Sequence, residues 1–436
     1  MRWLLAADGT ILDPGAVSRA VPGLYRTPRL RRSPSWAERG DRADRAYIRT
    51  FSGGKNAAWR AWDGNGSDGI GAGSKDAPAR EFSSRNRRPA IPAHTVTGMA
   101  GDRCKAGDLV EVRSRDEILS TLDDQGCLDA LPFMPEMLQY CGQRLRVYKA
   151  AHKTCDSTFY RDGRYMKNAV FLEDLRCDGT GHASCEAECS LFFKLAWLKP
   201  VEPMRNWATP AVAAVGGRDE QWLRTTTETT RPDGQTLYRC QATQHLAATR
   251  PIKRYDWALF WEDLRCSNWS LAHMGRTLLL LAVFDLRRLG VGWRAWDWLY
   301  RVLHRAFYGT MDPHIQGVIP GGSPTPLVTL DLVPGEMVRV RALDEIRATL
   351  NQRNRNRGLA FNPEMAPFSG GTYRVKRRVT RIVDERNGKL LEIKGSCIML
   401  EGGHCTARYH PEAPLCPRRI PQYFREAWLE RVSDRR

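Results

Sequence analysis

The sequence has no long hydrophobic segment. Its longest apolar run, residues 278–284, is far shorter than the roughly 20 residues that a helix needs to cross a membrane. The amino terminus, MRWLLAADG, carries an apolar run too short for the core of a secretory signal, and Asp8 ends it. We therefore expect a soluble, cytoplasmic protein. In that reducing compartment its 12 cysteines are expected to be thiols or metal ligands rather than disulfides.

Complete catalytic motifs are lacking as well. The chain contains no G-x-S-x-G, no Walker A loop and no H-E-x-x-H. Residues 64–69 match G-x-G-x-x-G, but a dinucleotide site needs a buried strand before this pattern and a helix after it, and neither is indicated here. The sequence therefore names no reaction. We expect a protein that is not an enzyme, and we assign no catalytic residue.

Acidic residues are too few to balance the basic ones. The chain has 67 Lys and Arg against 49 Asp and Glu, which gives a formal net charge of +18. Such an excess favours an anionic partner: nucleic acid, polysaccharide or an acidic membrane surface. The alternative is a genome that uses arginine freely, in which case the charge identifies no partner.

The 436 residues allow roughly two to four domains. Residues 1–100 mix arginine runs with Gly, Ser, Asp and Asn clusters and show no sustained periodicity, which predicts a disordered basic segment. Regular patterns begin only after it, with a β-rich run at residues 109–113. A capping box, Ser114 to Glu117, then predicts the start of a helix.

An internal repeat accounts for most of the remaining chain. Residues 335–429 follow the order of residues 107–198, beginning with GEMVRVR against GDLVEVR. The matches continue in register through a PEM segment and a Leu-Glu pair to a Cys/His cluster in each copy. We therefore predict a mainly β protein with two tandem SH3-like small β-barrel repeats, at residues 101–202 and 330–436.

Residues 203–329, between the two copies, predict a connector followed by an α-helical region. Within it Trp293, Trp296, Tyr300, Leu303 and Phe307 recur at steps of three and four residues and make one helix face. Two interpretations remain open: a helical hairpin that buries these aromatics, or a basic amphipathic helix on a membrane surface. The aromatic face also offers a surface for a protein partner.

The first Cys/His cluster has the composition of a zinc site. Its potential ligands are Cys177, His182, Cys185 and Cys189. Zinc favours four tetrahedral ligands from thiolate and imidazole, and short spacings of this kind close one turn of chain around the metal. We predict a structural zinc ion here. Buried free thiols and a disulfide are the alternatives.

The second cluster has one potential ligand fewer than the first. It keeps Cys405, His410 and Cys416, but Ile420 stands where the fourth ligand would follow. A water molecule, His404 or Cys397 would complete the set. An open fourth position is how catalytic zinc sites are built, whereas a degenerate structural site has the same appearance.

The chain also resembles a known family. The resemblance rests on five segments: residues 110–123, FMPEMLQYCG at 133–142, CDGTGHASC at 177–185, RCQAT at 239–243 and FREAWLERV at 424–432. In these it is similar to a family of uncharacterised bacterial proteins that are often encoded near polysaccharide or natural-product biosynthesis genes. The resemblance spans roughly residues 105–432 and implies no activity.

Together these features predict a non-catalytic, metal-stabilised binding or scaffold protein, accessory to a bacterial biosynthetic cluster. Two other functions stay open. One is a nucleic-acid-binding protein, since small barrels with basic faces bind single strands by stacking bases on aromatic side chains. The other is a metal-dependent enzyme with an open zinc position at Cys405, His410 and Cys416.

Overall fold

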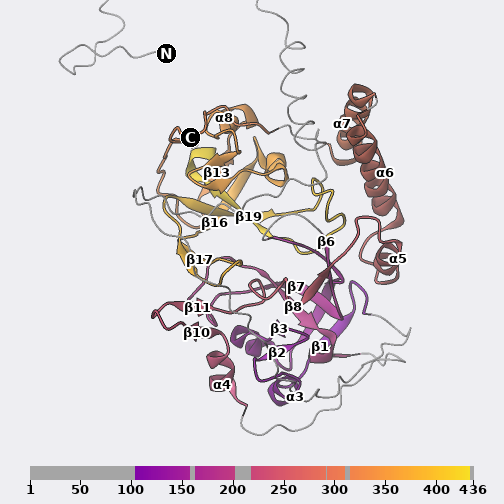
Figure 1. Ribbon diagram of the computed structural model, residues 1–436, viewed down its shortest axis with the longest axis vertical. Helices are drawn as coiled ribbons and strands as arrows, with labels where there is room; N and C mark the ends of the chain where they lie inside the picture. Colours follow the sequence, from indigo (N-terminus) through magenta and orange to yellow (C-terminus); the bar gives the residue numbers. More distant parts are fainter. Residues whose placement is uncertain (1–103, 158–162, 202–217, 291, 310–314, 433–436) are drawn as a thin grey trace, which may run out of the picture. The chain divides into compact units, whose positions relative to one another are not determined.

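The computed structural model describes residues 104–157, 163–201, 218–290, 292–309 and 315–432. All of them belong to one of the two units into which the chain divides, Ala79–Arg436. They form mostly β structure with a few helices, as predicted (Figure 1). The segment predicted to be disordered, residues 1–100, lies outside the described residues.

Two five-stranded antiparallel sheets are the largest sheets of the described structure. The first has the strand order β8-β7-β4-β1-β9, and the second has the order β20-β19-β16-β13-β21. The registers also correspond, because Leu109 pairs with Arg146 in the first sheet and Met337 pairs with Arg374 in the second. Below, residues that hold the same place in these two registers are called equivalent.

The first sheet domain comprises the described residues between 104 and 201. Its elements are β1 (Leu109–Val112), α3 (Arg115–Ser120), β2 (Cys127–Leu128), β3 (Leu131–Pro132), the 3₁₀ helix η1 (Pro135–Tyr140), β4 (Arg144–Ala150), β5 (Lys153–Cys155), β6 (Gly163–Met166), β7 (Ala169–Arg176), β8 (Ser190–Lys194), η2 (Leu195–Trp197) and β9 (Leu198–Pro200).

The second sheet domain comprises residues 315–432. Its elements are β13 (Met337–Val340), α8 (Leu343–Arg347), β14 (Arg355–Asn356), β15 (Leu359–Ala360), η3 (Pro363–Phe368), β16 (Thr372–Arg378), β17 (Arg381–Val383), β18 (Leu390–Glu392), β19 (Cys397–His404), β20 (Pro421–Arg425), η4 (Glu426–Trp428) and β21 (Leu429–Arg431).

The predicted capping box forms at the start of α3. The Ser114 hydroxyl accepts from the backbone N–H of Glu117, whose carboxylate accepts from the Ser114 N–H at 2.9 Å. Two N–H groups that the first helical turn leaves without partners are satisfied in this way. In the equivalent helix α8 the cap is Ala342, and the Glu345 carboxylate alone accepts from the cap N–H, at 3.0 Å.

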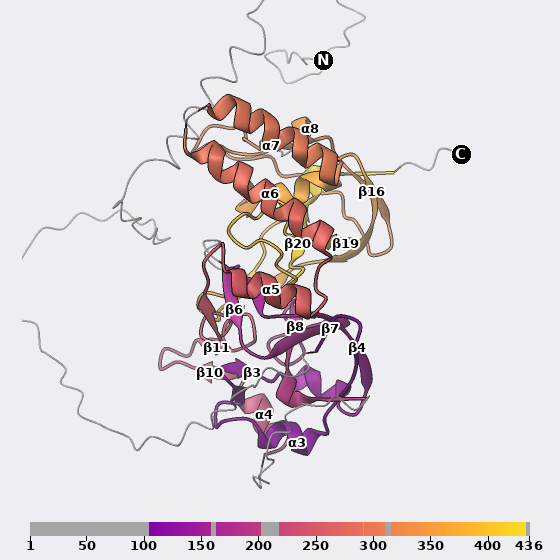
Figure 2. The same ribbon diagram turned by 90° about the vertical axis from the view of Figure 1, so that its right-hand side faces the viewer.

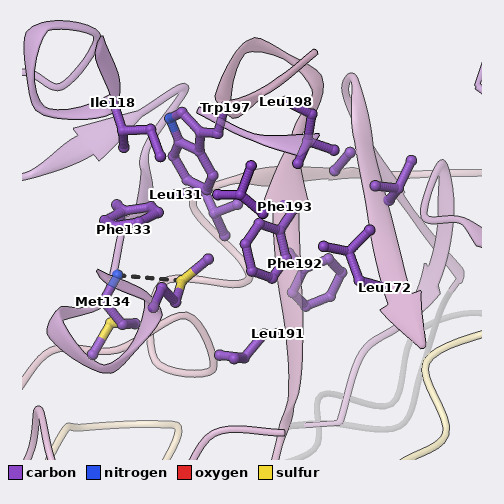
Figure 3. Close-up of a cluster of buried hydrophobic side chains, with 14 of the residues drawn as sticks. Ile118, Leu131, Phe133, Met134, Leu172, Leu191, Phe192, Phe193, Trp197 and Leu198 are labelled. Atoms are coloured by element: carbon purple, nitrogen blue, oxygen red, sulfur yellow. Dashed lines mark hydrogen bonds between the residues drawn. The ribbon is translucent and has the colours of Figure 1, made fainter. Parts of the chain in front are cut away.

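Each sheet domain has its own core, centred on one tryptophan. In the first, the ring of Trp197 meets Phe133 edge-on with 5.1 Å between centroids (Figure 3). In the second, Trp428 meets Phe361 in the same way, also at 5.1 Å. Each indole N–H donates to a threonine hydroxyl, at 3.1 and 3.0 Å. A buried indole needs such an acceptor, so this hydrogen bond fixes the ring within the core.

The chain between the sheet domains is partly β and partly helical. Its elements are α4 (Glu220–Thr225), β10 (Glu228–Thr230), β11 (Thr236–Tyr238), β12 (Thr249–Pro251), α5 (Trp257–Arg265), α6 (Leu271–Arg288) and α7 (Trp293–Tyr308). Strand β12 pairs with β6 and so adds an edge to the first sheet domain.

Helices α6 and α7 pack side by side (Figure 2). Tyr300 on the predicted aromatic face of α7 is buried against Leu280 and Val283 of α6, with Trp296 and Phe307 partly buried around them. This face therefore packs within the protein, as the helical-hairpin interpretation expects. None of the described helices combines the length and the apolar composition needed to cross a membrane.

The loops that carry the Cys/His clusters join the two sheet domains. The first Cys/His loop, residues 177–189, runs from β7 to β8. Its Glu186 carboxylate accepts from the N–H groups of Thr380 and Arg381 beside β17, and the Glu186 N–H donates to the Arg381 carbonyl at 3.0 Å. In the second Cys/His loop, residues 405–420, Arg418 donates to the Cys155 carbonyl of β5 at 3.1 Å. Each loop thus binds a strand of the other sheet domain.

Glu186→Ala tests this contact. The substitution removes the carboxylate that accepts from the Thr380 N–H, the Thr380 hydroxyl and the Arg381 N–H. It is expected to lower the free energy of unfolding by about 1.5–3 kcal/mol, because hydrogen bonds to a charged group are the stronger kind. Glu401→Ala is the matched control, since the Glu401 side chain is 57% exposed and its Arg374 partner lies at 3.7 Å. Urea unfolding of both variants measures the difference. Equal losses would contradict the role given to Glu186.

Candidate metal centres

The first Cys/His loop folds back on itself directly after β7. The Cys177 N–H donates to the Cys189 carbonyl at 2.9 Å, which closes the loop at its base. Gly179 has φ +77°, and a Cβ at this position would lie 2.0 Å from the Cys185 carbonyl oxygen. Only glycine permits this approach. The turn brings Cys185 back beside the residues that begin the loop.

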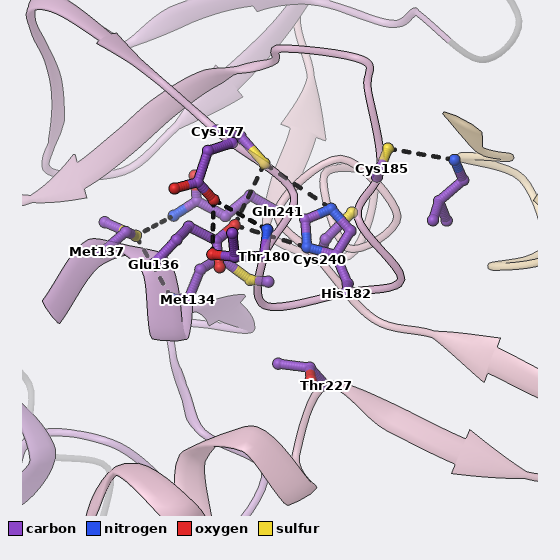
Figure 4. Close-up of polar contacts among 12 residues, drawn as sticks. Met134, Glu136, Met137, Cys177, Thr180, His182, Cys185, Thr227, Cys240 and Gln241 are labelled. Atoms are coloured by element: carbon purple, nitrogen blue, oxygen red, sulfur yellow. Dashed lines mark hydrogen bonds and ion pairs between the residues drawn. The ribbon is translucent and has the colours of Figure 1, made fainter. Parts of the chain in front are cut away.

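Three buried side chains, two from this loop and one from outside it, bring their donor atoms close together (Figure 4). The Cys177 thiol donates to Glu136 Oε1 at 3.2 Å, and its Sγ lies 3.8 Å from His182 Nε2. His182 Nδ1 lies 3.5 Å from Glu136 Oε1. Glu136 comes from η1, a separate segment, and none of the three side chains is more than 7% exposed. Thiol, imidazole and carboxylate are all zinc ligands.

Burial controls the protonation of these groups. It raises the pKa of Cys177 far above its ordinary range, raises the pKa of Glu136 and lowers the pKa of His182 to about 4. At neutral pH the imidazole is uncharged, as a metal ligand must be. Glu136 Oε2 and His182 Nδ1 have no hydrogen-bond partner among the described residues. A divalent cation would satisfy buried donor atoms of this kind and would stabilise the thiolate.

The remaining predicted ligands border the same space. Cys185 and Cys189 line, together with Cys177 and His182, a cavity of about 30 Å³. Cys185 Sγ also accepts from the backbone N–H of Val383 at 3.3 Å. The structure therefore gathers all four predicted residues around one cavity. Cys185 and Cys189 lie outside the group whose donor atoms are all within 4.8 Å of one another.

Two residues of this site were not among the predicted ligands. Glu136 belongs to the PEM segment that recurs in both copies. Cys240 lines the same cavity and belongs to the RCQAT segment. Local spacing cannot identify either residue, because each comes from a segment distant from the loop. The RCQAT segment was the available signal for Cys240.

The glutamate equivalent to Glu136 has a different role in the second sheet domain. Glu364 accepts from the N–H of Thr406 at 2.9 Å and from the N–H of Tyr409 at 2.6 Å. Both of its oxygens are therefore used to hold the backbone of the second Cys/His loop. Glu364 anchors this loop and is not available as a metal ligand.

Cys155 joins the three predicted residues of the second cluster. It packs with Cys416 and Ala413 in one buried group, and a hydrogen bond between the two thiols raises the pKa of Cys416. Burial also raises the pKa of Cys405, with a further contribution from Cys155. His410 Nδ1 is buried and has no hydrogen-bond partner among the described residues. Cys155, Cys405 and Cys416 interact with one another, and together with His410 they would make a set of four donors, one of them from β5 of the other sheet domain.

The residues proposed to complete this second cluster lie elsewhere. Cys397 packs with Val379 and Met399 in a separate hydrophobic group, and His404 lines a different cavity. Ile420 stands where the first loop has its fourth predicted ligand, Cys189, as the sequence predicted. The Cys405 N–H donates to the Ile420 carbonyl at 2.8 Å, just as the Cys177 N–H donates to the Cys189 carbonyl. The four donors of the second cluster do not form a group within 4.8 Å.

A third group of donors surrounds α5. His152, Glu262 and Cys266 have ligand atoms within 4.8 Å of one another. His152 Nε2 lies 3.0 Å from Asp263 Oδ1, and the Lys153 ammonium contacts the same carboxylate. This imidazole is therefore already paired with a carboxylate that holds α5 against β5, which disfavours a metal role.

Comparisons of the chain with protein-family models, with curated proteins and with solved structures find no match. The resemblance described from the five sequence segments therefore stays a prediction. Statements about function depend on the arrangement of the side chains described above.

Cys155→Ser tests the composition of the second cluster. Removing a thiolate ligand from β5 is expected to weaken Co²⁺ binding there by about tenfold or more, a loss of at least about 1.4 kcal/mol. The intensity of the thiolate-to-cobalt absorption band should fall as well. Cys397→Ser is the matched control, because Cys397 is a buried cysteine outside both clusters. If the two variants bind Co²⁺ equally well, Cys155 is not a ligand.

A pH titration of the metal-free protein tests the burial of His182. Its pKa is about 4 in the folded protein against an ordinary value of 6.5, so between these values the unfolded chain binds the extra proton. Stability is therefore greatest above pH 6.5 and falls as the pH decreases toward 4, by up to about 1.4 kcal/mol per pH unit from this group. His182→Gln should lose that part of the slope. An identical slope in both proteins would show that His182 titrates normally.

Proposed function

We propose that this is a non-catalytic binding or scaffold protein whose two sheet domains are held together by zinc. One observation carries the proposal: each Cys/His loop contacts a strand of the opposite sheet domain at its cysteines. The Val383 N–H donates to Cys185 Sγ, while the Cys155 thiol lies against Cys416. Val383 and Cys155 end the equivalent strands β17 and β5. The two contacts are therefore reciprocal.

The same reciprocity supports a duplication. We propose that the two sheet domains are tandem copies of one small domain of the SH3-like barrel kind. The identical strand orders, the paired registers and the Trp–Phe contact in each core support the common origin. After duplication, each copy would use its neighbour to cover the thiols of its own loop.

Zinc is the cation that fits the donor chemistry best. The first cluster offers carboxylate, thiolate and imidazole, and the second offers three thiolates and one imidazole. Zinc accepts all of these in tetrahedral sites, whereas calcium and magnesium prefer oxygen ligands. A second cluster of this composition would carry a net negative charge around zinc. Arg418, which is buried beside Cys155, supplies a compensating positive charge.

Burial favours a structural over a catalytic role. Cys177, His182 and Glu136 are at most 7% exposed, so a substrate would have no route to a metal held by them. In the second cluster Cys155, which packs against Cys416, would take the position that is open in a catalytic zinc site. A structural zinc site is closed in this way, with protein ligands in all positions.

The partner would be recognised by surfaces outside the clusters. Trp257 and Trp261 of α5 and Trp298 of α7 are each more than half exposed. Exposed aromatic side chains of this size are typical anchors in protein interfaces. A role accessory to a bacterial biosynthetic cluster is consistent with such a surface and rests on the family resemblance. A cytoplasmic location belongs to the same proposal, since the clusters require reduced thiols.

Calorimetry of the full chain with and without a chelator tests this function. The metal-loaded protein is expected to unfold in one cooperative transition, because the second zinc site would take ligands from both sheet domains and the first would fix a loop that binds β17. Removing the metal should lower the midpoint by several degrees and split the transition into two. Readdition of Zn²⁺ should restore the single transition. A chelator that leaves both the midpoint and the shape unchanged would contradict the structural-metal proposal.

A further inference from the structure

A cavity of about 260 Å³ opens between the two sheet domains, and no cysteine lies on its wall. Strands β7 and β19 contribute their final residues to it. Both strands have an irregular register there, between Phe171 and Arg176 and between Met399 and His404. These irregularities turn the strand ends away from regular pairing, so that side chains from both sheet domains face one space.

Equivalent positions of the two domains line this cavity with different residues. Arg176 at the end of β7 is equivalent to His404 at the end of β19, and Tyr148 on β4 is equivalent to Lys376 on β16. The pairs are alike in place but not in chemistry. A cavity that served only to fill the space between two copies would have no need of this difference.

The cavity carries positive charge that the protein does not neutralise. Arg176 donates to Ser190 Oγ and to the Arg419 carbonyl, both at 2.8 Å. Neither Arg176 nor Arg419 has a carboxylate within ion-pair distance among the described residues. Arg419 Nε is buried without a hydrogen-bond partner among those residues. Two guanidinium groups thus line one cavity, and N–H groups of both remain available to a ligand.

The acidic residues of the wall do not compensate for this charge. The Glu188 carboxylate is already paired with the Lys376 ammonium and lies 3.7 Å from Arg377. Asp174 is exposed at the edge of the cavity. An anion between the two guanidinium groups would relieve their repulsion.

The backbone around the cavity is strained at three positions. Asp174, Glu188 and Arg419 have φ values of 56°, 49° and 48°, in the left-handed region that non-glycine residues seldom adopt. All three residues line the cavity. Such strain persists where the surrounding structure maintains it, and it is concentrated at binding and active sites.

We propose that this cavity binds a small organic oxyanion, a phosphate or carboxylate compound, with its charged group between Arg176 and Arg419. Guanidinium groups recognise such planar or tetrahedral oxyanions through paired N–H donors. The apolar part of the ligand would lie against the Tyr148 ring, over which Arg419 is already placed at 5.1 Å from the centroid, and against Leu400. The ligand would contact none of the metal-binding cysteines, because none of them lines this cavity.

Isothermal titration of the full chain with inorganic phosphate and, separately, with succinate tests the site. At least one anion is expected to bind with one-to-one stoichiometry, and the affinity should fall as salt is raised. Binding of phosphate alone assigns a phosphate ligand, and binding of succinate alone assigns a carboxylate ligand. Binding of neither anion, at low salt and millimolar concentration, would overturn the proposal.

Arg419→Gln locates the binding. No hydrogen bond from the Arg419 guanidinium holds the fold among the described contacts, so this variant should remain folded and lose about tenfold or more in anion affinity. Arg176→Lys keeps the charge but not the paired donors, and should weaken binding as well. Arg374→Gln is the matched control, because Arg374 is half exposed on β16 and does not line the cavity. Affinity that is unchanged in Arg419→Gln, or equally reduced in Arg374→Gln, would contradict a site at this position.

Discussion

The burial of thiols and imidazoles in two loops is the constraint on which the structure depends. Burying such groups costs free energy unless each finds a hydrogen-bond partner or a metal. Each loop lies against a strand of the other sheet domain, β17 at Cys185 and β5 at Cys416. These contacts pair the two sheet domains. Glu186 of the first loop and Arg418 of the second loop add hydrogen bonds to the same two strands.

The loops also connect the metal clusters to the anion cavity. Glu188 and Arg419 belong to the ends of the two Cys/His loops and stand on the wall of that cavity. Both residues have a left-handed backbone, with φ values of 49° and 48°. A loop fixed by a metal at one end would hold these side chains in place at the other. The cavity is then preorganised for its ligand, which lowers the ordering cost of binding.

Local patterns in the sequence predicted much of the fold. Alternating apolar runs identified strands such as β1, the Ser114–Glu117 box located the start of α3, and the place of Ile420 opposite Cys405 was correct. Two cysteines from distant segments were missed. Cys240 and Cys155 reach the clusters only through tertiary packing, which spacing along one segment does not contain. The proposed completion by Cys397 was wrong for the same reason, since that thiol packs among Val379 and Met399.

The most direct test of the account is the zinc content and zinc environment of the full chain, purified without a chelator and without a histidine tag. Close to two zinc ions per chain are expected, with X-ray absorption showing a first shell of sulfur together with nitrogen and oxygen, in which thiolate is the commonest ligand. Metal should be retained through gel filtration. A chain without zinc, in which all 12 cysteines titrate as free thiols after unfolding, would contradict the proposal that metal holds the two sheet domains together.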